Sequence, residues 1–419
     1  MNNSNPSAPT QGAAPHPTNA ITRRRFLAGA GASAISLTVL NPKLVGAAEA
    51  NSKLDLGLIG CGNRGTWIAD LFQKHGGYNI AALADYFPDK TEAAGQKLGV
   101  PAARRFTGLS CYRKLLECKL DAVAIESPPY FHPTQAAAAV EAGKHVYLAK
   151  PIAVDVPGCQ TVAQSGRRAT ESKLVFLVDF QTRATAAYQE VVRRVHAGQI
   201  GPIKSAEAAY MCDLYFADMD AQFRKSNKDA TARLRAWAVN RVLSGDIITE
   251  QNIHALDVAS WFLDAEPVKA VGAGGRARDF AGDCWDHFSV IYTFPNDVLL
   301  TFSSRQFGAA YNDILCRVYG ATGTADTHYG GKVSMRGGDE FLNADTTDIY
   351  AAGVNSNIAA FYKSITGADY ANPTVAPSVR SNLVTILGRT AAYKRGEVTW
   401  IGMIKAGEKW EFDTTGLST

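Results

Sequence analysis

Lys150 and His254 are the two side chains of this sequence with the best chemistry for proton transfer. An amine and an imidazole each hold or release a proton near neutral pH when their surroundings shift the pKa. Glu250, His254 and Asp257 are spaced by four and three residues, so they share one face if residues 247–263 form a helix. A carboxylate one turn away would orient the imidazole and raise its basicity. A single helical histidine is more often structural, so the spacing alone leaves both interpretations open.

A glycine-rich segment after residue 59 is suited to a different task, the binding of phosphate groups. The apolar run 54–59 has the length of a strand, and it leads into the sequence GCGNRG and a helical pattern up to residue 72. In this G-x-G-x-x-G pattern the first glycine allows a tight turn, the second lets backbone approach a pyrophosphate, and the third lets helix pack on strand. Unpaired N–H groups at the helix N-terminus then bind phosphates. The expected contact residues are Gly60, Gly62, Asn63, Arg64 and Gly65.

A carboxylate stands at the end of the next apolar run. Residues 80–84 are apolar, and Asp85 follows them, twenty residues beyond Gly65. An acid at this place accepts hydrogen bonds from an adenosine ribose and repels a 2′-phosphate, which favours NAD over NADP. Arg64 and Lys90 are close in sequence and would weaken this preference. The alternative is an ordinary turn in which Asp85 caps a helix.

Strand-like and helical segments alternate further along the chain. The run 122–126 leads to a Ser-Pro pair, a helical segment covers 134–142, and the run 143–148 leads to Ala149-Lys150-Pro151. This order predicts a parallel sheet with helices on both faces. Ligands of such sheets bind beyond the carboxyl ends of the strands. The cofactor contacts expected there are Ser127, Pro128, His132 and Lys150.

The pattern changes from about residue 152, where several strands follow one another after a helix over 184–197. The expected strands cover residues 203–211, 269–274, 287–294, 298–302 and 313–319. Strands in succession indicate a largely antiparallel, open sheet. Late helices over 357–365 and 378–394 are expected to fold back on the core. The sequence therefore predicts an α/β chain, with a doubly wound Rossmann domain over 51–151 and an α+β substrate and oligomerisation domain over 152–419.

The first fifty residues have the features of an export signal. Three arginines, Arg23 to Arg25, precede an apolar stretch from Phe26 to Leu40, and Ala48-Glu49-Ala50 follows. This is the pattern of a twin-arginine signal peptide, residues 1–50, cleaved after Ala50. The fifteen residues of the apolar stretch are fewer than the roughly twenty that a membrane span needs. We therefore expect a periplasmic or otherwise extracytoplasmic protein that is exported folded, without stable membrane insertion after cleavage.

Charge and cysteine content argue against other classes of partner. The net charge is +4 for the whole chain and +1 without the first fifty residues, so nucleic acid is not an expected ligand. The seven cysteines include no Cys-x-x-Cys pair. Neither a disulfide framework nor a metal site is therefore expected.

Together these motifs resemble the Gfo/Idh/MocA oxidoreductases, the family of glucose–fructose oxidoreductase and inositol dehydrogenase. The resemblance covers essentially the whole chain after residue 50. It rests on segments 60–65, Asp85, 127–132, 143–151 and the Glu250-x-x-x-His254-x-x-Asp257 motif. Two positions depart from the family pattern: Ala149 replaces the usual Glu of Glu-Lys-Pro, and Ser127 replaces a more common Thr. The acid missing at Ala149 lies near the nicotinamide in relatives.

The resemblance implies NAD as cofactor, a carbohydrate as substrate, and a homo-oligomer, either dimer or tetramer. It places Lys150, Glu250 and His254 around the reacting hydroxyl. Lys150 would hold and polarise the oxygen, His254 would take the proton, and Glu250 would bind substrate or orient His254. Arg183 and Asp257 are candidate substrate ligands, although a solvated charge and a supporting residue are equally good interpretations.

Export restricts the possible chemistry, because free NAD is not regenerated outside the cytoplasm. The cofactor of an exported enzyme must stay bound and be recycled, either by a sugar oxidoreductase or by an NAD-dependent glycoside hydrolase. The hydrolase would oxidise a hydroxyl, eliminate the glycosidic group, add water and reduce the ketone. It needs a further base, for which Tyr130, Tyr210 and Tyr215 are candidates. A non-catalytic protein that binds NAD or sugar is a third hypothesis, supported only by Ala149.

Overall fold

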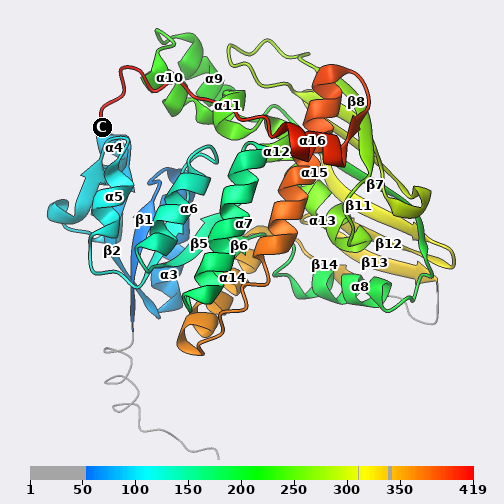
Figure 1. Cartoon of the computed structure of the whole chain (residues 1–419), viewed down its shortest axis with the longest axis horizontal. Helices are drawn as coiled ribbons and strands as arrows, with labels where there is room; N and C mark the ends of the chain where they lie inside the picture. Colours follow the sequence, from blue (N-terminus) through cyan, green and yellow to red (C-terminus); the bar gives the residue numbers. More distant parts are fainter. Residues whose placement is uncertain (1–52, 310, 338–341) are drawn as a thin grey trace, which may run out of the picture. The chain divides into compact units, whose positions relative to one another are not determined.

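The computed structural model describes residues 53–309, 311–337 and 342–419, and these residues form two β-sheets with their covering helices (Figure 1). The predicted export signal, residues 1–50, lies outside the described residues. Among the residues that are described, no helix is long and apolar enough to cross a membrane.

The first sheet has six strands that are all parallel to their neighbours. Its strands are β1 (Leu54–Ile59), β2 (Tyr78–Asp85), β3 (Arg105–Thr107), β4 (Ala122–Ile125), β5 (His145–Ala149) and β6 (Phe176–Asp179), and its helices are α3 (Asn63–His75), α4 (Pro88–Leu98), α5 (Cys111–Leu116), α6 (His132–Glu141) and α7 (Val156–Glu171). β4 and β6 are buried throughout, as strands covered on both faces must be. The predicted Rossmann fold is confirmed, and its sheet continues beyond residue 151 to the end of β6.

The strand order β3-β2-β1-β4-β5-β6 determines which residues meet at the carboxyl edge of this sheet. Asp85 ends β2, Gly60 follows β1, Glu126 follows β4, and Lys150 follows β5. Ile125 of β4 pairs with Leu148 of β5, so the next residues along the two strands are neighbours at the edge.

The second sheet has nine strands in the order β14-β13-β12-β11-β7-β10-β9-β8-β15. These are β7 (Ile203–Cys212), β8 (Lys269–Gly275), β9 (His287–Thr293), β10 (Leu299–Gln306), β11 (Asp313–Gly320), β12 (Gly323–His328), β13 (Lys332–Gly337), β14 (Leu342–Asp345) and β15 (Val398–Thr399). β7 and β10 pair in parallel, and the other described pairs are antiparallel. The predicted open, largely antiparallel sheet is confirmed.

Helices join the two sheets and cover one face of the second. They are α8 (Ala186–His196), α9 (Ala217–Arg224), α10 (Ala230–Arg235), α11 (Arg241–Ser244), α12 (Ile247–Glu250), α13 (Ile253–Leu263), α14 (Ile349–Thr366), α15 (Val375–Lys394) and α16 (Trp400–Ala406). α13 and α15 pack on the second sheet, and α15 also contacts α7 (Figure 1). The single helix considered for residues 247–263 is wrong, because Gln251 and Asn252 interrupt it between α12 and α13.

The late helix α14 returns to the nucleotide-binding sheet and packs on α3. Ile358 and Phe361 of α14 are fully buried among apolar residues of that first domain. The Phe361 ring lies 6.5 Å from that of Phe72 and 5.7 Å from that of Tyr147, between ring centres. As predicted, the late helices fold back on the core, and α14 completes the hydrophobic core of the Rossmann domain.

Candidate active site

The glycine turn after β1 has the geometry of a dinucleotide-binding loop. Gly60 has φ +97°, in the left-handed region where glycine is favoured. A Cβ on Gly65 would lie 1.9 Å from the Gly60 carbonyl oxygen, so the close approach of helix to strand requires glycine. A Cβ on Gly62 would meet no atom of the described residues within 4 Å. Packing therefore does not require glycine at position 62, and the free space suits the approach of a pyrophosphate to the N-terminus of α3.

Asp85 connects the end of β2 to this turn. Its Oδ2 accepts a hydrogen bond from the Cys61 N–H at 2.7 Å, and its Oδ1 accepts one from the Phe87 N–H at 2.9 Å. Burial raises the pKa of Asp85. Each carboxylate oxygen keeps a free lone pair, so the side chain can still bind ribose hydroxyls. The turn and Asp85 together fit the two ends of an adenosine diphosphate.

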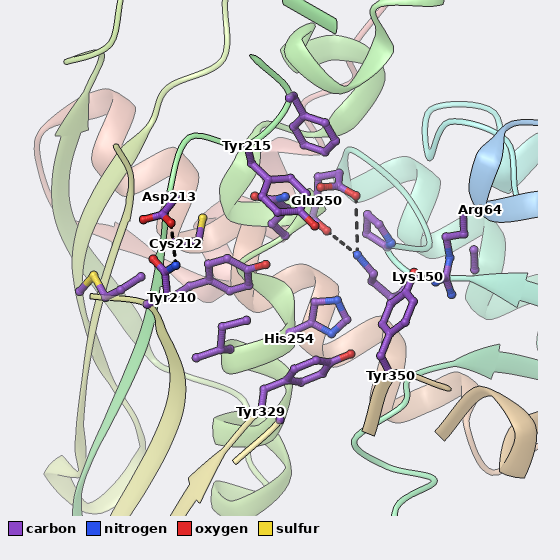
Figure 2. A pocket seen from close by; sticks show the side chains of 18 of the residues that line it. Arg64, Lys150, Tyr210, Cys212, Asp213, Tyr215, Glu250, His254, Tyr329 and Tyr350 are labelled. Carbon is purple, nitrogen blue, oxygen red and sulfur yellow. Dashed lines mark hydrogen bonds and ion pairs between the residues drawn. The ribbon is translucent and has the colours of Figure 1, made fainter. Parts of the chain in front are cut away.

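A cavity of about 1040 Å³ opens where the carboxyl edge of the first sheet faces the second sheet (Figure 2). Lys150 enters it from the first domain, and Glu250 and His254 enter it from the second. Other lining residues include Arg64, Glu126, Ser127, His132, Tyr210, Tyr215, Tyr329 and Tyr350. Lys150 and His254, one hundred and four positions apart in the sequence, thus share one cavity.

The Lys150 amine is held by Glu250. Its Nζ donates a hydrogen bond to the Glu250 carbonyl oxygen at 2.7 Å and lies 3.6 Å from Glu250 Oε1 (Figure 2). Burial lowers the pKa of Lys150, although the charge of Glu250 acts in the opposite direction. Glu250 therefore contacts the amine, and within the part of the chain that the structure describes its free Oε2 and the free Nδ1 of His254 form no hydrogen bond with each other.

His254 is a neutral imidazole at the cavity. It is 8% exposed, and none of the described residues forms a hydrogen bond with its buried Nδ1. Its ring centre lies 5.2 Å from that of Tyr329. Burial, together with the charges of Lys150 and Arg64, lowers the pKa of His254 well below 6.5. An uncharged imidazole beside an amine can accept a proton from a bound hydroxyl group.

Arg64 is at the centre of a polar cluster at the inner end of the cavity. Its Nη2 lies 2.6 Å from Asp179 Oδ2, and its Nη1 donates a hydrogen bond to the Tyr350 hydroxyl at 2.6 Å. Glu126 Oε2 lies 3.2 Å from Arg64 Nε. The sequence predicted Arg64 as a cofactor contact, but gave no sign of Asp179 or Tyr350, because both come from distant segments.

His132 and Ser127 organise the loop after β4. The His132 ring nitrogens lie 2.8 Å from the Pro151 carbonyl oxygen and 2.6 Å from that of Ser127, so the ring connects the two loops. Ser127 Oγ donates to Gln135 at 2.5 Å. Ser127 and His132 line the cavity, whereas Pro128 forms the adjoining turn and is not among the lining residues.

Arg183 and Asp257 do not reach the cavity. Arg183 Nε donates to both oxygens of Asp257, at 2.9 and 3.0 Å, and Ser381 Oγ donates to Asp257 at 2.7 Å. The guanidinium also stacks on the Trp261 ring at 4.9 Å. The structure thus contradicts the placement of these residues as substrate ligands, because their side chains form an ion pair with each other inside the second domain.

The three candidate tyrosines have different environments. Tyr130 packs against Phe131 and Phe412 and lies outside the cavity lining. Tyr210 and Tyr215 line the cavity, and burial raises the pKa of each. Their hydroxyls therefore stay protonated and are better hydrogen-bond donors than bases. Among the described residues, no three His, Cys, Asp or Glu side chains are grouped as metal ligands would be.

Comparisons with known proteins match both domains. A family model described as "Oxidoreductase family, NAD-binding Rossmann fold" matches residues 54–180, and one described as "GFO/IDH/MocA C-terminal domain" matches residues 188–326. A "Glycosyl hydrolase family 109 protein 2" of Phocaeicola vulgatus is 30% identical, over 40% of this chain and 41% of that protein. An "Inositol 2-dehydrogenase" of Rhizobium meliloti is 24% identical, over 81% and 95%.

Solved structures share the fold of the chain. A scyllo-inositol dehydrogenase from Lactobacillus casei with bound NAD(H) and scyllo-inositol has a TM-score of 0.67 at 19% identity, over 83% of this chain and 99% of that one. An aldose-aldose oxidoreductase from Caulobacter crescentus has a TM-score of 0.66 at 20% identity, with the same coverage.

Proposed function

Because the chain belongs to the Gfo/Idh/MocA family and has its NAD-binding Rossmann domain, we propose that it is an oxidoreductase acting on a secondary hydroxyl of a sugar or sugar derivative. One observation carries this proposal: Lys150 and His254 come from different domains and line the same cavity, at the carboxyl edge of the nucleotide-binding sheet. The inositol dehydrogenases among the relatives support a polyhydroxylated substrate.

Different residues would bind the cofactor, polarise the substrate hydroxyl and accept its proton. The Gly60–Gly65 turn and Asp85 would hold NAD, which supplies the acceptor for the hydride of the carbon that carries the hydroxyl. Lys150 donates a hydrogen bond to the substrate oxygen and favours its negative charge. His254 accepts the hydroxyl proton. Glu250 holds the amine in place through its carbonyl group, 2.7 Å from Lys150 Nζ.

We also propose that the protein acts outside the cytoplasm, with a tightly bound NAD that is recycled in place. The twin-arginine pattern of residues 1–50 supports this location, because that route carries folded proteins with their cofactors.

The test begins with the protein purified from its own export route, free of residues 1–50. Its NAD content is measured, and free sugars and inositols are then supplied without added cofactor. NADH formation, or exchange of hydrogen between two sugars, is the expected result. A Lys150→Met variant should retain NAD and lose turnover. Equal turnover in the variant, or no binding of NAD, would contradict the proposal, and no turnover in either protein would favour the non-catalytic hypothesis.

An NAD-dependent glycoside hydrolase is the second candidate. The family 109 glycosyl hydrolase among the relatives favours it, although Tyr210 and Tyr215 at the cavity are hydrogen-bond donors and do not supply the further base that it needs. Both candidates use Lys150 and His254, so the assay must separate them. Release of the aryl group from an aryl glycoside, with no net formation of NADH, would select the hydrolase.

A further inference from the structure

Glu126 is a carboxylate whose burial is not explained by the protein around it. Its side chain is 0% exposed, and neither oxygen accepts a hydrogen bond from any described residue. Among the residues that the structure describes, its ion-pair partner is Arg64, whose Nε lies 3.2 Å from Oε2 without hydrogen-bond geometry. Buried carboxylates are normally hydrogen-bonded. Glu126 is also among the residues that line the cavity, so its buried carboxylate lies within the wall of the space where ligands bind.

Asp179 already forms an ion pair with Arg64, so the guanidinium has a counter-charge without Glu126. Asp179 Oδ2 lies 2.6 Å from Arg64 Nη2 and accepts a bond from Gln181 Nε2 at 3.1 Å. Its Oδ1 accepts one from Asn357 Nδ2 at 2.8 Å. Asp179 is thus fully bonded within the protein. Glu126 is the additional negative charge of the cluster, and its pKa is raised to about 7, chiefly by burial.

The strand order places Glu126 at the strand ends over which the nicotinamide half of a bound dinucleotide would extend. Asp85 would hold the adenosine half over β2, and the glycine turn would hold the pyrophosphate over β1. The remaining half must then extend over β4 and β5, where Glu126 and Ala149 end their strands side by side. Ala149 has no charge, so Glu126 is the acid of this pair of strand ends.

We propose that Glu126 selects the oxidised form of the cofactor, its carboxylate stabilising the positively charged nicotinamide ring of NAD⁺ over the neutral ring of NADH. A buried opposite charge favours the charged form of a neighbouring group, and burial reduces screening by salt. The proposal rests on NAD binding and not on the identity of the substrate. It therefore stands or falls separately from the proposed oxidoreductase activity.

The experiment measures the ratio of the dissociation constants for NADH and NAD⁺, by exchanging bound NAD⁺ for NADH and following NADH fluorescence. Glu126→Gln keeps the shape of the side chain and removes its charge. We expect the ratio to fall by about tenfold or more, because an adjacent opposite charge changes a pKa by about 1 to 3, and a change of 1 is a factor of ten in an equilibrium constant. Glu126→Asp keeps the charge and should retain most of the wild-type ratio. Glu92→Gln, at an exposed carboxylate paired with Arg105, is the matched control and should leave the ratio unchanged.

A purely structural role would weaken the binding of both cofactor forms equally, and an unchanged ratio in folded Glu126→Gln would overturn the proposal. Thermal unfolding establishes whether the variants fold. Glu126→Met provides a second neutral side chain if the glutamine variant is unstable, since Arg64 keeps its bond to Asp179 in either case. A fall in the ratio in either neutral variant supports the proposal.

Discussion

Replacing Asp257 with asparagine should destabilise the protein without changing substrate binding. The Asp257 side chain is fully buried, and that of Arg183 is 13% exposed, so the substitution leaves a nearly buried guanidinium without its counter-charge. Breaking a buried ion pair by removing one partner costs about 3–5 kcal/mol. We expect about 3 kcal/mol, the lower end of this range, because an asparagine oxygen can still accept one bond from Arg183.

The assay combines urea unfolding with steady-state kinetics. Glu397→Gln is the control, because the Glu397–Lys269 pair is about half exposed and should contribute less than about 1 kcal/mol. The double replacement of Asp257 by Leu and Arg183 by Met should recover much of the lost stability, since no uncompensated charge remains. A tenfold higher KM for Asp257→Asn with unchanged stability would refute this reasoning and return both residues to the substrate site.

Three further outcomes are expected. Lys150→Met and His254→Ala should each lower kcat by about 10²–10⁴-fold while NAD remains bound, as single-turnover kinetics would show. Gly65→Ala should unfold the turn, since the added Cβ meets a carbonyl oxygen at 1.9 Å, whereas Gly62→Ala should fold normally and raise the Kd for NAD at least about tenfold by calorimetry. With saturating cofactor, kcat/KM should stay level as the pH falls past 6.5, because the pKa of His254 is lowered and the imidazole remains neutral. It should decrease before the pH reaches 10.5, because the pKa of Lys150 is lowered and the amine loses its charge earlier. A decrease of kcat/KM at acid pH centred on 6.5 would contradict the assignment of His254 as the base.

The local sequence was sufficient to predict structure wherever the conformation of a segment depends on its own residues. The glycine turn needs Gly60 for its positive φ and Gly65 for close packing, and both requirements are visible as residue types. Alternating or continuous apolar runs likewise predicted β7 to β11, because burial on one or both faces follows from strand periodicity. The lysine and histidine of the cavity were identified from motifs, and the structure brings them to one place.

Contacts between distant segments could not be predicted in this way. Asp257 has the spacing of a helix face shared with His254, yet its partner is Arg183, which lies 74 positions away. The interruption at Gln251 and Asn252 separates Glu250 from the helix that carries His254, and neither glycine nor proline marks that position. From the sequence, Glu126 is only the last residue of an apolar run. Its charged cluster with Arg64 and Asp179 is formed by three distant segments and could not be predicted.

The return of α14 to the first domain has a consequence for biosynthesis. Ile358 and Phe361 complete a core whose other members lie almost entirely between Leu54 and Leu177, so an isolated nucleotide-binding fragment would expose apolar surface to water. Tyr350, at the start of the same helix, also holds Arg64 at the cavity. The core of the nucleotide-binding domain is therefore complete only after α14 has been synthesised, nearly two hundred residues beyond the end of β6.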